Sequence, residues 1–559
     1  MRLSQASELW WKNAVVYCLD IETYVDGDGD GVGDFRGAIQ RIDHLDRLGV
    51  TCVWLMPFFP TPDRDDGYDI VDFYGVDPRL GTLGDFVEFV RTARDRGIRV
   101  IADLVVNHTS DQHPWFRESR SSRDARRRDW YIWSDRPEPD DPEGMVFPDQ
   151  ENSLWELDEQ TGQYYFHRFY RFQPDLNTAN PEVRDEIAKI LGFWMELGLS
   201  GFRVDAVPFV VERVQGDEKL PDPHEFFGEL RAFMNRRDGT AMLLGEVNLP
   251  YDDLLTYFGS TPLGNELTMC FDFIGMQRMY LSLARADAQP LASALRSRPK
   301  PPKDAQWATF IRNHDELTLD KLTEAEREEV FEAFAPDPGM RLYNRGIRRR
   351  LPPMLDGDPR RLRLVYSLLF SLPGTPVLFY GEEIGMGENL DLEGRQAVRT
   401  PMQWTPNLHG GFSTATPAIP LTSGRYGPEN VNVTAQRRDP GSLLSWMARL
   451  IEQYRECPEL AHGTYQVLDT PDPAVLAHRA DLDGETVLAV HNFADTPAKV
   501  DLTLDGLDSG KVLTDLLLDG TVQISDDGRA GFDLEPYGCR WFRASTPETA
   551  PADAPQGSP

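Results

Sequence analysis

A short apolar stretch, residues 201–207, carries two charged side chains that could do chemistry. Arg203 and Asp205 alternate with apolar residues, so on a β-strand both charges point to the same face. Burying a carboxylate without a partner is costly, and an adjacent arginine keeps Asp205 ionised at neutral pH, as a nucleophile must be. A purely structural ion pair is the alternative interpretation.

Two further carboxylates follow apolar runs in the same way. Glu246 comes directly after the apolar residues 242–245, and Asp315 follows His314 behind the run 308–312. An ionised carboxylate beside a carboxylic acid in less polar surroundings is the arrangement that cleaves glycosidic bonds. Retention or inversion depends on the distance between the two carboxyl groups, so spacing along the chain leaves both open.

The elements that must position these side chains alternate between strand-like runs and helix-like segments. The apolar runs are 15–17, 52–56, 100–106, 201–207, 242–247, 268–273, 308–312 and 377–380. Eight βα units of this kind predict an α/β protein with a (β/α)8 TIM barrel, whose active site lies at the carboxyl ends of the strands. Asn107, His108, Asp205, Glu246 and Asp315 all fall at such ends.

Composition changes along the chain predict further domains. Residues 109–177 lack a long period, which indicates an inserted small domain after strand 3 of a barrel formed by 1–108 and 178–455. From 456 to 545, short alternating runs with turn signals predict a C-terminal antiparallel β-sandwich. The last residues, 546–559, are rich in Pro and Ala and are predicted to be a disordered tail.

The net charge of the chain limits the classes of partner that it can bind. The 559 residues carry a formal net charge of -33, which argues against nucleic acid and anionic membranes, since both need a basic surface. We therefore expect a small neutral or cationic ligand. No apolar run approaches the length of a membrane span, and the first 13 residues show no secretory signal, so we expect a cytoplasmic protein. A homo-oligomer is compatible with this reading.

Four motifs together resemble those of the α-amylase family, glycoside hydrolase family 13. They are Asp103 to His108, Gly201 to Asp205, Gly245 with Glu246, and Arg312 to Asp315, within a resemblance that spans about residues 10–544. The resemblance implies that Asp205 is the nucleophile, Glu246 the acid/base, and Asp315 the clamp on the 2- and 3-hydroxyls of the sugar. It also implies that His108, His314 and Arg203 line the same sugar subsite.

Other stretches resemble the α-glucosidase and oligo-1,6-glucosidase branch of that family. They are 173–177, 65–69 and 399–404. The resemblance implies that Gln173 belongs to the substrate site and that an Asp and an Arg, here Asp65 and Arg399, close the pocket around the non-reducing glucose. Tyr68 is then expected to be the platform on which that glucose stacks. A pocket closed at one end predicts an exo-acting enzyme for small α-glucosides.

Within the family, residues 312–319, 346–351 and 371–386 are most similar to trehalose synthases. This implies interconversion of maltose and trehalose through a β-glucosyl-enzyme, with hydrolysis as a side reaction. The chain departs from those enzymes at 247–251 and 271–273, near the leaving group. An exo-acting α-glucosidase or a transglucosylase for other small α-glucosides is therefore the alternative. A catalytically inactive interaction subunit is a remote alternative, because all three carboxylates are present.

An acidic loop near the N-terminus predicts a structural metal site. Oxygen ligands recur at alternate positions with Gly between them, as at the start of an EF-hand loop, although the twelfth position is Gly37 instead of Glu. A Ca²⁺ or Mg²⁺ ion is the expected occupant, a solvated acidic turn the alternative, and no organic cofactor is expected. The predicted ligands are Asp26, Asp28, Asp30, the carbonyl of Val32, and Asp34.

Overall fold

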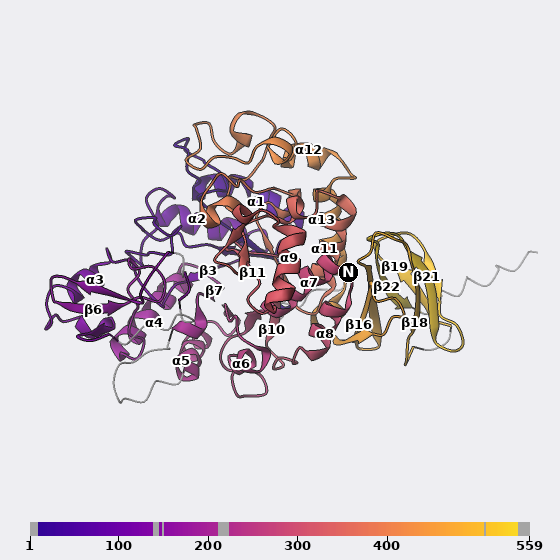
Figure 1. Ribbon diagram of the computed structural model, residues 1–559, viewed down its shortest axis with the longest axis horizontal. Helices are drawn as coiled ribbons and strands as arrows, with labels where there is room; N and C mark the ends of the chain where they lie inside the picture. Colours follow the sequence, from indigo (N-terminus) through magenta and orange to yellow (C-terminus); the bar gives the residue numbers. More distant parts are fainter. Residues whose placement is uncertain (1–8, 138–144, 148–149, 211–222, 508–509, 546–559) are drawn as a thin grey trace, which may run out of the picture. The chain divides into compact units, whose positions relative to one another are not determined.

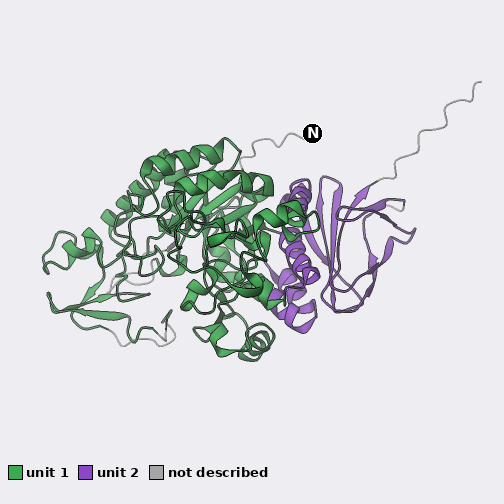
Figure 2. Ribbon diagram, turned by 90° about the horizontal axis from the view of Figure 1, so that it is seen from above, with its two compact units in different colours: residues 1–277, 299–356, 374–448 green, residues 278–298, 357–373, 449–559 purple. Residues whose placement is uncertain are grey.

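The computed structural model describes residues 9–137, 145–147, 150–210, 223–507 and 510–545 (Figure 1). The predicted disordered tail, 546–559, lies outside these residues. Contacts divide the chain into two units (Figure 2). The first comprises 1–277, 299–356 and 374–448, and the second 278–298, 357–373 and 449–559. The last boundary between the units lies between residues 448 and 449, whereas the sequence predicted a domain boundary at 456. The predicted domain limits stay predictions.

In the first unit, eight parallel strands of the described chain form a closed barrel, in the order β1-β14-β10-β9-β8-β7-β3-β2. Each lies within or overlaps one of the eight predicted apolar runs, so the (β/α)8 barrel is confirmed. The strands are buried on both faces, which explains why they read as continuous apolar runs. They are β1 (Val16–Leu19), β2 (Cys52–Leu55), β3 (Arg99–Leu104), β7 (Gly201–Val204), β8 (Met242–Gly245), β9 (Met269–Phe271), β10 (Gln306–Phe310) and β14 (Thr375–Phe379).

Helices alternate with these strands, and some of them begin and end at capping residues. The side chain of Asp34 accepts a hydrogen bond from the Gly37 N–H at the start of α1, which ends at left-handed Gly49. Thr82 and Asp85 form a capping box at the start of α2. The α-helices outside the insertion are α1 (Phe35–Leu48), α2 (Leu83–Arg94), α4 (Pro181–Glu196), α5 (Pro223–Asn235), α6 (Tyr251–Thr256), α7 (Phe273–Arg285), α8 (Gln289–Ser297), α9 (Glu324–Phe334), α10 (Leu351–Met354), α11 (Pro359–Ser371), α12 (Val433–Arg438), α13 (Leu443–Arg455) and α14 (Pro458–His462).

The segment between β3 and β7 forms a small structure of its own, drawn in violet in Figure 1. It contains α3 (Pro114–Ser119) and an antiparallel sheet in the order β4-β6-β5. The sheet strands are β4 (Trp133–Ser134), β5 (Trp155–Asp158) and β6 (Gln163–Phe166). A β-bridge between His108 and Asp175 ties the end of this insertion back to the end of β3. The insertion therefore borders the carboxyl ends of the barrel strands.

A second small sheet follows β10 directly. It has the order β11-β13-β12, with β11 (Leu317–Thr318), β12 (Arg341–Leu342) and β13 (Gly346–Ile347). Residues 311–316 connect β10 to β11, and Asp315 lies in this short link between the barrel and the small sheet.

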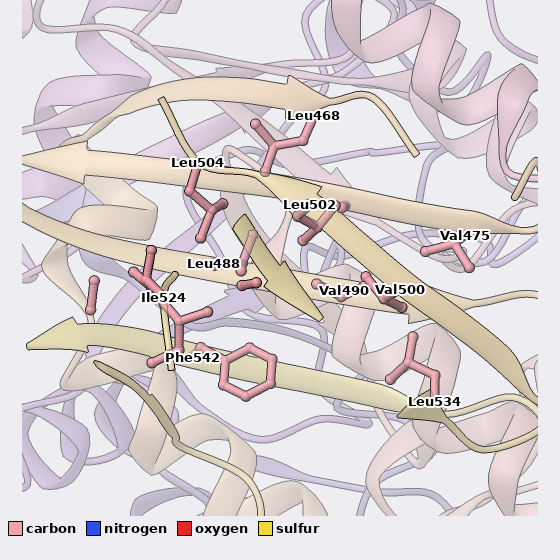
Figure 3. Packing of buried hydrophobic residues seen from close by; sticks show 14 of the residues in the cluster. Leu468, Val475, Leu488, Val490, Val500, Leu502, Leu504, Ile524, Leu534 and Phe542 are labelled. Atoms are coloured by element: carbon pink, nitrogen blue, oxygen red, sulfur yellow. The ribbon is translucent and has the colours of Figure 1, made fainter. Parts of the chain in front are cut away.

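The second unit contains the predicted C-terminal antiparallel β structure. A six-stranded sheet, β15-β16-β17-β22-β19-β20, and a two-stranded sheet, β18-β21, contribute to one apolar core (Figure 3). Leu488, Leu502 and Phe542 are among its buried residues. The strands are β15 (Thr464–Leu468), β16 (Val475–Leu482), β17 (Glu485–Asn492), β18 (Ala498–Thr503), β19 (Val512–Asp515), β20 (Thr521–Gln523), β21 (Arg529–Leu534) and β22 (Cys539–Ser545). Within the described chain, every helix is too short or too polar to cross a lipid bilayer.

Candidate active site

The three predicted catalytic carboxylates lie in one cavity at the carboxyl ends of the barrel strands. Asp205 follows β7, Glu246 follows β8, and Asp315 follows β10 in the loop before β11. The cavity has a volume of about 650 Å³, within the range of pockets that hold small molecules. Its walls also include Asp65, Tyr68, His108, Phe147, Arg168, Ala206, Phe209, Asn248, Leu249, Phe273, Asn313, Glu316, Asp320, Lys321, Arg345 and Arg395.

A fully buried arginine contacts both Asp205, the predicted nucleophile, and Glu246, the predicted acid/base. Arg203 Nη1 donates to Asp205 Oδ1 at 2.5 Å and to Asp103 Oδ1 at 2.6 Å. Its Nη2 forms an ion pair with Glu246 Oε2 at 2.8 Å. Glu246 Oε2 also accepts the backbone N–H of Ala206 at 3.2 Å. One guanidinium group therefore fixes the positions of Asp205 and Glu246 relative to each other.

Burial separates the protonation states of the two carboxyl groups. It raises the pKa of Asp205 to about 6, because the loss of hydration outweighs the stabilising charge of Arg203. It raises the pKa of Glu246 to about 7, again against the opposing effect of Arg203. Burial therefore favours the protonated form of both groups, and Asp205 loses its proton at a lower pH than Glu246. A nucleophilic carboxylate and a general acid need this order.

Asp315 is held in its ionised form by several cations. Arg395 Nη1 lies 2.9 Å from Asp315 Oδ1, and Arg399 Nη2 donates to the same oxygen at 3.1 Å. Burial alone raises the pKa of Asp315, but the positive charges of Arg395 and Arg399 outweigh that effect and hold this pKa below its usual range. A carboxylate that stays ionised accepts hydrogen bonds from sugar hydroxyls at any physiological pH.

Tyr68 and His314 form a rigid pair beside these carboxylates. Their rings stack with centroids 5.7 Å apart, and Tyr68 Oη lies 2.7 Å from His314 Nε2. Tyr68 Oη also donates to Asp103 Oδ2 at 3.4 Å, an oxygen that accepts the Trp54 indole N–H at 2.8 Å. Burial lowers the pKa of His314 well below its usual value, so its imidazole is neutral. Tyr68 lines the cavity, and this network fixes its ring.

His108 and Asp65 line the same part of the cavity. His108 Nε2 bonds the carbonyl oxygen of Tyr68 at 3.1 Å, and burial lowers the pKa of His108 to about 4, so this ring is also neutral. Asp65 Oδ2 accepts the amide N–H of Gln173 at 2.7 Å. Burial raises the pKa of Asp65 to about 7, with Arg395 and Gln173 opposing the rise.

Four residues predicted to bind substrate lie behind the cavity wall instead of in it. Arg203 and His314 hold the residues that line the cavity, and Gln173 holds Asp65. Arg399 pairs with Asp66 Oδ2 at 2.5 Å, whereas Asp65 lines the cavity. The predicted closure of the pocket around a glucose by Asp65 and Arg399 stays a prediction.

Several cavity residues escaped the sequence analysis. Arg395 and Glu316 form an ion pair at 2.7 Å, directly beside Asp315. The polar network around Asp320 was also missed, although Asp320 accepts from Asn248 Nδ2 at 3.1 Å and from Gln277 Nε2 at 3.0 Å. The only available signal was their spacing, one, four and five residues from predicted site residues, which does not distinguish an inward from an outward side chain.

The two departures from trehalose synthases fall partly in the cavity. Leu249 and Phe273 line it. Tyr251 is not among the lining residues; its hydroxyl donates to Asp272 Oδ1 at 2.8 Å. The cavity wall therefore combines the apolar Leu249 and Phe273 with the polar Asn248 and Asp320.

The acidic loop before α1 brings together three of its five predicted metal ligands. Oxygens of Asp26, Asp28 and Asp34 lie within 4.8 Å of one another. Asp30 is exposed and lies outside this group, and its Oδ1 accepts the Val32 N–H at 2.8 Å. Backbone N–H groups contribute as well, since Asp26 Oδ1 accepts from Gly29 at 2.6 Å and Asp34 Oδ2 from Gly27 at 2.7 Å. These oxygens suit a hard cation.

Known proteins are similar to this chain in sequence and in fold. Residues 21–333 and 349–463 match the family model "Alpha amylase, catalytic domain", and residues 484–543 match "Sucrose hydrolase-like, C-terminal domain". Trehalose synthase of Pimelobacter sp. is 42% identical over 557 residues, covering 97% of this chain and 96% of that protein. Oligo-1,6-glucosidase of Parageobacillus thermoglucosidasius is 31% identical, over 87% of this chain and 91% of that protein.

Solved structures agree with the sequence relatives. The isomaltulose synthase SmuA of Protaminobacter rubrum superposes with a TM-score of 0.77 at 26% identity, over 96% of this chain and 99% of that chain. The trehalose-6-phosphate hydrolase of Bacillus licheniformis gives 0.76 at 27% identity, with 96% and 100% coverage. The family model, the near full-length relatives and the carboxylates at the strand ends all agree. The chain is an enzyme of the α-amylase family, glycoside hydrolase family 13.

Proposed function

We propose that this enzyme interconverts maltose and trehalose through a β-glucosyl-enzyme, with hydrolysis as a side reaction. The proposal rests on one observation above all: Asp205, Glu246 and Asp315 share one small cavity, in a chain that is 42% identical to a trehalose synthase over nearly its whole length. The names of other relatives, which include oligo-1,6-glucosidases, support the broader class of small α-glucosides as substrates.

In the first half of the reaction, a glucose unit is transferred from the disaccharide to the enzyme. An oxygen of ionised Asp205 attacks the anomeric carbon and forms a new C–O bond, while the glycosidic C–O bond breaks. Protonated Glu246 gives its proton to the departing oxygen. Asp315 accepts hydrogen bonds from the ring hydroxyls, and Arg395 and Arg399 keep it charged for that purpose.

In the second half, the freed glucose stays, turns over and becomes the acceptor. Glu246, now a carboxylate, removes the proton from the anomeric hydroxyl of that glucose. The resulting oxygen attacks the anomeric carbon of the glucosyl-enzyme and releases Asp205, so two displacements retain the α configuration. Water in the same position yields glucose instead. The balance between isomerisation and hydrolysis depends on how well the cavity excludes water.

The first experiment is ¹H NMR of the purified enzyme with maltose, and separately with trehalose, following the anomeric signals. Trehalose that appears from maltose in excess of free glucose supports the proposal. Glucose as the sole product identifies an exo-acting α-glucosidase. Loss of every product in an Asp205→Asn variant is the control that assigns the reaction to this cavity.

We also propose that the acidic loop binds one Ca²⁺ or Mg²⁺ ion through Asp26, Asp28 and Asp34. The ion would hold the first βα loop in place and take no part in the reaction. Chelation with EDTA should lower the melting temperature and leave kcat at 25 °C unchanged, and the same treatment of an Asp28→Asn variant should change the melting temperature less. An unchanged melting temperature of the wild type on chelation would remove support for this site.

A further inference from the structure

A second cavity lies at the amino ends of β3 and β7, opposite the cavity that contains Asp205. It has a volume of about 280 Å³. Arg99, the first residue of β3, and Ser200, which directly precedes β7, both line it. The two strands pair in parallel, and Asp205 follows the carboxyl end of β7. The length of the strands therefore separates the second cavity from the active site.

The polar side chains of this wall carry hydrogen-bond donors and positive charge. They belong to Arg94, Arg99 and Ser200. The other wall residues are apolar or glycine, namely Val90, Gly97, Ile98, Val100 and Gly198. The cavity that contains Asp205 differs, because several carboxylates line it. Among the described residues, the wall of the second cavity thus has two cations and no anion, in a chain whose 91 acidic residues outnumber its 58 basic ones.

The guanidinium of Arg94 lies against the wall at Gly198. A Cβ atom added to Gly198 would lie 2.8 Å from Arg94 Nη2 and 2.9 Å from Val90 Cγ1. The φ of Gly198 is 109°, a backbone conformation that favours glycine. Because residue 198 has no side chain, the guanidinium has room at the edge of the cavity.

Arg99 is held by an aromatic ring on one face. Its Cζ lies 4.8 Å from the centre of the Trp10 ring, and Trp10 Nε1 donates to the carbonyl oxygen of Thr240 at 2.7 Å. A guanidinium that stacks on a ring uses its flat face, so the N–H groups at its edge can bind another partner. Arg99 is therefore oriented without using its hydrogen-bond donors.

A neighbouring arginine has a carboxylate partner, whereas the two arginines of the cavity do not. Arg91, one turn before Arg94 in α2, has Nη2 2.7 Å from Glu88 Oε2. Within the part of the chain that the structure describes, no carboxylate lies at ion-pair distance from Arg94 or Arg99. The donors of both arginines can therefore serve a ligand in the cavity.

We infer that the second cavity binds a small phosphate-type oxyanion, either inorganic phosphate or the phosphate group of a sugar phosphate. The planar fork of an arginine matches two oxygens of a phosphate, and the hydroxyl of Ser200 adds a donor. A neutral sugar needs acceptors for its hydroxyls, and this wall has no carboxylate to offer them. The volume of about 280 Å³ also suits an ion better than a disaccharide.

The negative net charge of the chain does not prevent this binding. At physiological ionic strength, charges farther away than about 8 Å are largely screened. The two arginines in the wall therefore dominate the potential that an anion meets in the cavity. This site goes beyond the proposed function, and its test measures binding alone, so it is independent of the product that the enzyme forms from maltose.

The test is isothermal titration calorimetry of the full chain with inorganic phosphate, at constant ionic strength in Hepes and potassium chloride. Two charge-assisted arginine contacts correspond to a Kd on the order of 1 mM. Arg94→Gln and Arg99→Gln each remove one of these contacts, and each should weaken binding by about tenfold or more.

A parallel titration with glucose 6-phosphate distinguishes the two sources of the phosphate group. Tighter binding than that of inorganic phosphate supports the inference and assigns a sugar phosphate as the ligand. Weaker binding, with the same dependence of the phosphate affinity on Arg94 and Arg99, supports the free ion.

Arg91→Gln is the matched control. Arg91 lies in the same helix and is exposed, but it is not among the residues that line the cavity. This variant should keep the wild-type Kd within roughly a factor of two. Circular dichroism checks that each variant is folded. If Arg99→Gln does not fold because it loses its contact with Trp10, Arg94→Gln tests the inference alone, since Arg94 is exposed.

The melting temperature gives a second measurement. Phosphate should raise it relative to chloride at the same ionic strength, because a ligand that binds only the folded chain stabilises that state. The rise should be smaller in Arg94→Gln and Arg99→Gln than in the wild type and Arg91→Gln. Two outcomes would overturn the inference: no binding of phosphate or glucose 6-phosphate to the wild type, or binding that Arg94→Gln and Arg99→Gln leave unchanged, which identifies an adventitious ion only.

Discussion

Replacing Asp103 with Asn should move the acid limb of the pH–rate profile to lower pH. Asp103 is fully buried in β3, where Oδ1 accepts from Arg203 and Oδ2 from the indole of Trp54. Asparagine has nearly the same shape and keeps one carbonyl oxygen as an acceptor. The substitution removes one of the three carboxyl groups around Arg203 and leaves Asp205 and Glu246 in place.

The size of the change in the pKa of Asp205 follows from the distance between Asp103 and Asp205, which both contact Arg203 Nη1. Oxygens of Asp103 and Asp205 lie 2.6 and 2.5 Å from Arg203 Nη1, so they are at most about 5 Å apart. At an effective dielectric constant of about 20, two unit charges at that distance repel by about 3 kcal/mol, or about two pKa units. The pKa of Asp205 is raised to about 6 in the native protein, and Asp103 contributes to that rise. Without Asp103 this pKa should fall by about one to two units, since Arg203 screens part of the repulsion.

The assay is kcat/KM for p-nitrophenyl α-glucoside as a function of pH, which reports the free enzyme. The reaction needs ionised Asp205, so a lower pKa extends activity toward acid. The basic limb reports Glu246 and should also move toward lower pH, because Asp103 and Glu246 repel each other across Arg203. Asp158→Asn, which changes a buried carboxylate paired with Arg120 at 2.6 Å, is the control. An acid limb that stays within about half a unit of the wild type, or moves upward, refutes the electrostatic account.

Three further variants test other contacts. Tyr68→Phe removes the hydroxyl that lies 2.7 Å from His314 Nε2 and keeps the ring, so kcat/KM for maltose should fall, by roughly tenfold. Gln173→Ala removes the donor to Asp65 at 2.7 Å, and KM measured by initial rates should rise more than kcat falls. Burial lowers the pKa of His478 to about 3, so at a pH below its unfolded pKa of about 6.5 the unfolded chain binds a proton that the folded chain does not. The free energy of unfolding should therefore decrease by about 1.4 kcal/mol for each unit by which the pH is lowered. Urea titrations of His478→Gln should lose that contribution, and an unchanged pH dependence would contradict it.

Local sequence patterns were sufficient to predict the barrel and to place three carboxylates at the ends of its strands. Strands buried on both faces are continuous apolar runs, and helices with caps such as Asp34 and Gly49 separate them, so the βα alternation is visible without tertiary information. Asp205, Glu246 and Asp315 directly follow such runs. Because the carboxyl ends of parallel strands meet at one end of a barrel, their convergence follows from the fold itself.

The contacts around those carboxylates were decided only by the tertiary structure. Whether Arg399 meets Asp65 or Asp66 depends on the turn at Asp66, whose φ is 51°, and neighbouring residues cannot be distinguished by spacing. The link from Arg395 to Phe147 joins residues far apart in the sequence, whose approach depends on how the insertion folds over the strand ends. The pKa values of Asp205 and Glu246 likewise depend on burial by the whole barrel. The sequence by itself determined which chemical groups are present, and the tertiary structure decided which partners each group has.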